Sequence, residues 1–85
     1  MGLDTVELVM DVEEVFEISF SDKEASEIET VGEFYETILS KLPNGETRKK
    51  EVWEQLRKII GKYISKKDFE KITPEARIVK DLGIN

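Results

Sequence analysis

The fold of this 85-residue chain is decided by the stretch Leu3-Asp4-Thr5-Val6-Glu7-Leu8-Val9-Met10-Asp11-Val12-Glu13-Glu14-Val15-Phe16. Its apolar residues recur every three or four positions, at Leu3, Val6, Val9, Met10 and Phe16, with Val12 and Val15 widening the stripe. This spacing is typical of an amphipathic α-helix. We therefore expect a helix from Leu3 to about Phe16.

Two capping boxes mark the starts of the next two helices. In each, a hydroxyl side chain is followed three residues later by a glutamate, so that both can bind free amides of the first turn. The boxes are Ser21 with Glu24 and Thr30 with Glu33. A short helix to about Ile28 is expected after the first box. A long amphipathic helix is expected after the second, and Pro43 ends it.

The second half of the chain begins with a connecting turn over residues 43–47, where Asn-Gly tolerates left-handed backbone and Thr47 is a candidate cap. A third long helix is expected from about 48 to 64. From about Ser65 to Asn85 the helical period is lost, and we expect an extended, ordered loop with one possible helical start at Thr73-Pro74. Its anchors are the apolar residues Phe69, Ile72, Ile78, Val79 and Leu82.

Composition limits the possible functions. The chain has no cysteine and no histidine, which removes disulfides, thiol nucleophiles and the commonest general base and metal ligand. Residues 1–42 contain twelve acidic residues against two lysines, net −10, whereas residues 43–85 contain seven acidic and eleven basic residues, net +4. The acidic half argues against nucleic-acid binding and favours a basic protein partner. Without a signal peptide or membrane-spanning stretch, we expect a soluble cytoplasmic protein with no membrane insertion.

Three segments of the chain resemble parts of the acyl carrier protein family, in a changed order. The stretch Val52–Ile60 is similar to the family's first helix, and Ile72–Gly83 is similar to its long first loop. In the family this loop continues into Asp-Ser-Leu-Asp-Thr-Val-Glu-Leu-Val-Met. Here the chain stops at Asn85, and Leu3–Met10 carries that remainder at the other end. The chain therefore resembles a circularly permuted carrier protein.

The resemblance implies an all-α fold, namely a permuted four-helix bundle of three long helices and one short one. It implies a single domain over residues 1–85. Residues 1–42 would be equivalent to the family's second to fourth helices, residues 43–47 would be the connecting turn, and residues 48–85 would be equivalent to the first helix and long loop.

The family's attachment serine falls at Gly2, next to Leu3 and facing Asn85 across the break. Glycine has no hydroxyl to form the phosphodiester with 4'-phosphopantetheine, so we expect no cofactor. The remaining serines do not replace it. Ser21 and Ser65 are explained by their places at helix ends, and Ser19, Ser26 and Ser40 lack the Asp-Ser-Leu setting.

An acidic stripe on the first helix is the main candidate site, because Asp4, Glu7, Asp11 and Glu14 are spaced three or four residues apart. In carrier proteins this helix docks on basic surfaces of partner enzymes, which implies such a role here. The implied partner-binding residues are Asp4, Val6, Glu7, Met10, Asp11, Glu13 and Glu14. A solvated face is the ordinary alternative for a charged run. We expect no catalytic residue and no metal site, because nothing arranges a substrate cleft or metal-ligand spacing.

The aromatic residues Phe16, Phe34, Tyr35, Trp53 and Tyr63 stand at helical apolar positions and are expected to pack in or on the core. A carrier protein's core can also open around an acyl chain. Met10, Val15, Ile38, Leu39 and Ile59 are candidates to line such a space, although a filled core is the simpler expectation.

The resemblance predicts a noncatalytic, monomeric module that docks on enzymes of fatty-acid, lipid or polyketide biosynthesis. Two alternatives stay open. The chain is a genuine acyl carrier modified at another residue, or it is a structural or engineered permutant without a partner.

Overall fold

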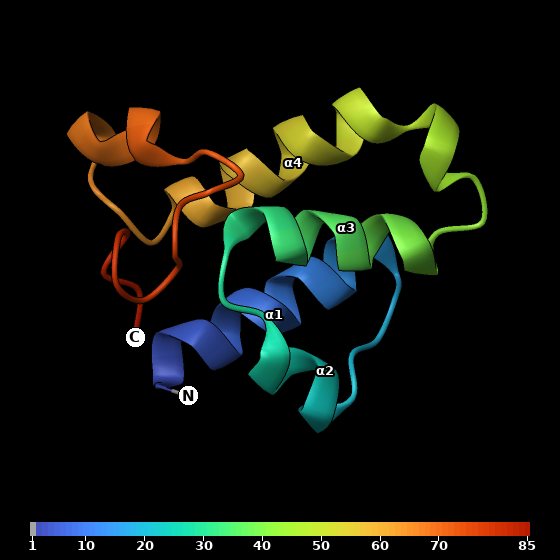
Figure 1. Cartoon of the computed structure of the whole chain (residues 1–85), viewed down its shortest axis with the longest axis horizontal. Helices are drawn as coiled ribbons and strands as arrows, with labels where there is room; N and C mark the ends of the chain where they lie inside the picture. The colour runs from blue at the N-terminus through green and yellow to red at the C-terminus, as the bar shows by residue number, and fades with distance from the viewer. Residues whose placement is uncertain (1) are drawn as a thin grey trace.

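The chain forms a small helical bundle, as the computed structural model shows for residues 2–85 (Figure 1). Met1, the first residue of the expected 1–85 domain, lies outside the described residues. The helices are α1 (Leu3–Phe16), α2 (Asp22–Glu27), α3 (Val31–Lys41) and α4 (Lys49–Gly61), with 3-10 turns η1 (Gly45–Thr47) and η2 (Lys66–Lys71). The all-α class and the three long helices with one short one are confirmed. Across residues 2–85, no helix is both long enough and apolar enough to cross a membrane.

Both predicted capping boxes form. The Ser21 hydroxyl accepts the Glu24 amide at 3.1 Å, and the Glu24 carboxylate accepts the Ser21 amide at 2.9 Å. Thr30 and Glu33 make the same pair of bonds at the start of α3. The hydrogen bonds that backbone N–H groups donate to the Glu24 and Glu33 carboxylates lower the pKa of both glutamates. The starts of α2 and α3 are thus set by residues within one turn.

The face that α1 buries differs from the stripe that predicted the helix. The buried residues are Thr5, Leu8, Val12 and Phe16. Leu3 and Met10 lie on the opposite side of the helix, and their side chains are 83% and 59% exposed. Eight apolar residues spread around α1, so their period shows that it is a helix but does not single out one buried face.

The core lies where α1 and α3 both pack against α4. Its fully buried side chains include Leu8 from α1, Phe34 and Ile38 from α3, and Leu56 and Ile60 from α4. Of the five aromatic residues that were expected to pack in or on the core, Phe16 and Phe34 are buried, while Tyr35, Trp53 and Tyr63 are partly buried against it. The expected packing role of the aromatic residues is confirmed.

The connecting turn is partly helical, since η1 occupies its second half, and Thr47 does not cap α4. The Thr47 hydroxyl instead donates to the Asn44 carbonyl at 2.9 Å, inside η1. Arg48 takes the cap position without a side-chain cap, and its guanidinium pairs with Glu51 at 2.9 Å. The helix ends at Gly61, three residues earlier than expected.

The segment after Ser65 is not extended throughout, because η2 occupies residues 66–71. The ring of Phe69 lies so close to Gly61 that a Cβ there would meet it at 3.0 Å. The Arg57 guanidinium also lies over the Phe69 ring, 4.5 Å from the ring centre. These contacts hold η2 against α4.

No helix starts at Thr73-Pro74, because backbone carbonyls of this segment accept hydrogen bonds from the first turn of α3. The Pro74 and Ala76 carbonyls accept the free amides of Gly32 and Val31, at 2.8 and 2.9 Å. Those amides lie in the first turn of α3, where intrahelical partners are missing.

Two predicted anchors of the C-terminal loop, Ile72 and Ile78, are buried. Phe69 and Leu82 are partly buried, but Val79 is half exposed. Its place as an anchor is taken by Ile84, which is 1% exposed.

The two ends of the sequence lie side by side (Figure 1). The Asn85 carbonyl oxygen accepts the backbone amides of Asp4 at 2.6 Å and Thr5 at 3.2 Å. Gly2 is the N-cap residue of α1 and makes no side-chain cap. The end of the chain therefore satisfies amides that a capping side chain would otherwise bind.

Candidate docking surface

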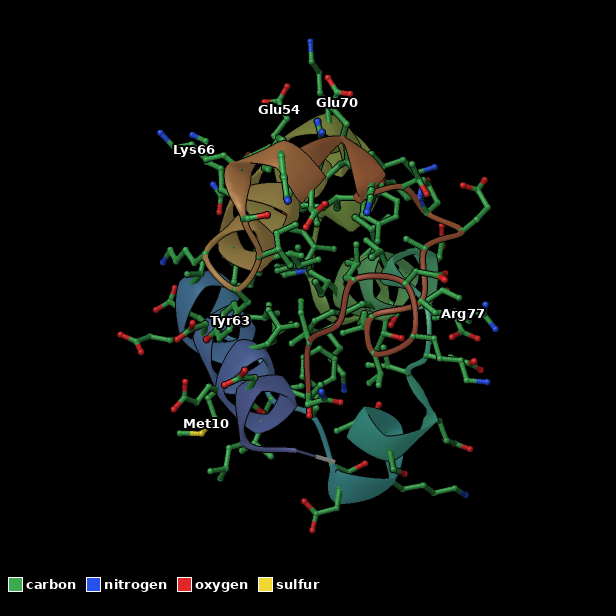
Figure 2. The ribbon with its side chains drawn as sticks, turned by 90° about the vertical axis from the view of Figure 1, so that its left-hand side faces the viewer. Met10, Glu54, Tyr63, Lys66, Glu70 and Arg77 are labelled. Carbon is green, nitrogen blue, oxygen red and sulfur yellow. The ribbon has the colours of Figure 1, made fainter. Side chains whose placement is uncertain are left out.

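The outward side of α1 combines carboxylates with exposed apolar side chains. Asp4, Glu7 and Glu14 are exposed. Leu3 and Met10 lie among them about two helical turns apart, and Figure 2 shows Met10 pointing away from the molecule. This arrangement follows from helical geometry, since positions 3, 7, 10 and 14 stack on one side of a helix. We refer to Leu3, Glu7, Met10 and Glu14 as the α1 outer face.

The carboxylates of Glu7 and Glu14 make no hydrogen bond or ion pair to any residue of the described range 2–85. Their charge is therefore directed at solvent. Val6, another of the expected partner-binding residues, is 39% exposed beside them. Together these residues form a continuous acidic and apolar surface.

Two of the expected partner-binding residues are engaged inside the fold. The Glu13 carboxylate accepts the backbone amide of Phe20 at 2.8 Å and so holds the segment that leaves α1. The Asp11 carboxylate accepts the hydroxyl of Tyr63, just beyond α4, at 2.5 Å. Both side chains are partly buried. The structure therefore separates the expected partner-binding carboxylates into outward and internal ones, which the sequence does not distinguish.

Tyr63 reports the electrostatic effect of the acidic helix. Burial of its hydroxyl and the hydrogen bond to Asp11 raise the pKa of Tyr63 well above its ordinary value, and the charges of Glu7 and Asp4 add to the increase. A negative field disfavours the phenolate. The acidic residues of α1 thus act together on a group at the boundary with α4.

The position expected to match the family's serine has no room for a side chain. A Cβ on Gly2 would overlap the carbonyl carbon of Asn85 and lie 2.6 Å from its oxygen. The hydroxyls of other serines are engaged locally: Ser26 and Ser40 donate to backbone carbonyls and Ser65 donates to Asp68.

The residues suggested as an acyl-chain lining do not come together. Ile38 and Leu39 are buried in the core, while Met10 and Val15 are exposed. Val15 and Ile59 share only a surface hollow beside α4.

A different hollow, of about 270 Å³, lies between α1, α2, α3 and the 78–79 loop. No pattern in the sequence marks this hollow, because its apolar lining comes from four separate segments. That lining includes Leu8, Val9, Ile28, Phe34 and Ile78.

A scan against protein-family models and a search of solved structures both find no match for this chain. The arrangement of its own side chains is therefore the basis for a functional assignment. Within residues 2–85, no group of three or more acidic side chains is placed to hold a metal ion. The α1 outer face places carboxylates and exposed apolar side chains on one side of a helix.

Proposed function

We propose that this chain is a noncatalytic docking module similar to an acyl carrier protein. It binds enzymes of fatty-acid, lipid or polyketide biosynthesis through α1. The observation that carries this proposal is the α1 outer face, with two carboxylates without internal partners beside exposed Leu3 and Met10. Such a surface complements a basic one with an apolar centre, because opposite charges speed and orient the encounter while apolar contact adds affinity.

The proposed architecture is the carrier bundle in circularly permuted order. Helices α1, α2 and α3 would correspond to the family's second to fourth helices, α4 to its first helix, and the segment after Ser65 to its long loop. Two observations support this order. The ends of the sequence are adjacent, and the carbonyl of Asn85 caps the first turn of α1. A direct connection from Asn85 to Gly2 would then require no additional segment.

The module we propose has no phosphopantetheine arm. The serine position is occupied by Gly2, which has no hydroxyl and is packed against Asn85. Its contribution to an assembly line would be recognition rather than carriage of an acyl group.

Binding to purified, immobilised ketoacyl synthase and acyltransferase tests the docking role. The variant Glu7→Lys with Glu14→Lys should weaken binding by about tenfold or more, because two attractive charges become repulsive. Glu13 and Asp11 are left intact because their reversal would disturb the fold. The matched control, Glu27→Lys with Glu36→Lys on α2 and α3, changes the net charge equally and should bind like the parent chain. Absence of binding by the parent, or equal loss in both variants, would overturn the proposal.

Mass spectrometry tests the missing arm separately. After incubation with a phosphopantetheinyl transferase and coenzyme A, the mass of the chain should be unchanged. A gain equal to the arm would show that this is a genuine carrier modified at another residue.

A further inference from the structure

A row of three lysines runs along one side of α4 and continues onto η2. Lys58 and Lys62 are four residues apart on α4 and its C-terminal end, and Lys66 begins η2. All three are exposed, and within residues 2–85 none forms an ion pair. They line one hollow together with Gly61 and the ring of Phe69. We refer to Lys58, Lys62 and Lys66 as the basic row.

The basic row borders a second hollow that connects it to α1. Lys58 and Lys62 line this hollow with Ile59 of α4 and Val15 of α1. Val15 is 49% exposed, so the hollow has an accessible apolar surface. Lys58 and Lys62 therefore lie between two apolar surfaces. Phe69 provides the surface on one side, and Val15 and Ile59 provide the surface on the other.

The acidic and basic rows occupy neighbouring strips of the same side of the molecule. The bond between Tyr63 and Asp11 joins the end of α4 to the middle of α1, so Tyr63 lies on the seam between them. Figure 2 shows Met10 and Lys66 projecting on the same side, with Tyr63 between them. Despite this proximity, no ion pair connects α1 to α4 among the described residues.

Such a side is complementary to itself. If a two-fold axis runs along the seam, in the plane where two copies meet, the acidic strip of each copy faces the basic strip of the other. A two-fold interface has this property, because residue i contacts residue j and j contacts i. Glu7 and Glu14 then face lysines, while Leu3 and Met10 meet the apolar surface beside the basic row.

We propose that this side of the molecule is a pairing surface for a second copy of the same chain. The net charge of −6 on each copy opposes association at long range. The pairing is therefore weak and concentration-dependent, and a dilute sample is monomeric. It also covers Glu7 and Glu14, so a second copy competes with an enzyme for α1, although the pairing itself does not depend on the proposed docking function.

Two charge-reversal variants test the pairing by analytical ultracentrifugation over a range of concentrations. One carries Glu7→Lys with Glu14→Lys, which makes both strips basic. The other carries Lys58→Glu with Lys62→Glu, which makes both strips acidic. Each alone should self-associate at least about tenfold more weakly than the parent chain. An equimolar mixture should associate like the parent, since every strip then faces its opposite.

A chain with all four changes provides the decisive control. Its strips are exchanged in charge, so it should regain self-association at unchanged net charge. The variants Glu27→Lys with Glu36→Lys and Lys50→Glu with Lys80→Glu carry the same charge changes elsewhere and should pair like the parent. Circular dichroism verifies that each variant is folded.

A parent chain that stays monomeric at the highest concentrations would overturn the pairing. So would a failure of the mixture and the four-change chain to recover association. The docking proposal is separable, because the Lys58 and Lys62 variant keeps the α1 outer face and should still bind an immobilised enzyme.

Discussion

Gly2 is packed closely against the backbone of Asn85. Its Cα faces the Asn85 carbonyl, whose oxygen accepts the amides of Asp4 and Thr5 at the start of α1. The backbone angles of Gly2 are ordinary extended ones that any residue adopts. The constraint at this position is therefore the lack of space beside Asn85.

Substitution at Gly2 should lower stability through the displacement of Asn85. We expect Gly2→Ala to reduce the free energy of unfolding by about 1 kcal/mol, because the two hydrogen bonds that backbone amides donate to Asn85 lengthen or break. Gly2→Ser should cost less, since a serine at the N-cap can itself accept an amide of the first turn. Urea unfolding followed by circular dichroism measures both. An alanine variant as stable as the parent would show that Asn85 does not cap α1.

Glu13 and Asp11 are residues whose roles could not be predicted from the sequence. Asp11 belongs to the same acidic stripe as Glu7 and Glu14, and Glu13 is expected to bind partners together with them. Their roles diverge because the Phe20 amide donates to Glu13 and the Tyr63 hydroxyl donates to Asp11, whereas Glu7 and Glu14 have no such donor in the described part of the chain. A charge-reversal experiment designed from the sequence would include Glu13. A loss of binding could then come either from the lost charge or from a less stable fold.

At the scale of elements, the helices were predictable and the buried face of α1 was not. Capping boxes are local, so the starts of α2 and α3 follow from Ser21 and Thr30. In α1, apolar residues occupy both sides of the helix, and which side is buried depends on α3 and α4. The structure buries the side with Leu8 and leaves Met10 to solvent.

Truncation of one residue from each side of α1 distinguishes these faces. Leu8→Ala should reduce the free energy of unfolding by about 2–5 kcal/mol, because it leaves a cavity in a closely packed core. Met10→Ala should change it by less than about 0.5 kcal/mol, as expected of an exposed position. Chemical denaturation of the two variants provides the comparison. Similar losses for both would mean that Met10 is buried in solution.

At the scale of the whole molecule, the adjacency of the chain ends makes the permuted order testable. A chain that joins Asn85 directly to Gly2, without Met1, and opens between Pro43 and Asn44 would have the segment order of the carrier family. Pro43 and Asn44 are exposed, so a break there removes little packing. We expect this chain to keep the helical content and a single cooperative unfolding transition. Circular dichroism spectra and urea titration measure both properties. Loss of cooperative unfolding would contradict the proposed equivalence of the two orders.

The helical class, the positions of the long helices and the two capped starts follow from the amino-acid sequence alone. These features depend on contacts within about four residues, which periodicity and capping residues encode directly. Only the tertiary structure decided which side of α1 is buried, which of its carboxylates remain available, and that an acidic strip lies beside a basic one. Those outcomes depend on distant pairs such as Tyr63 with Asp11, which lie 52 residues apart and meet only when α1 packs on α4.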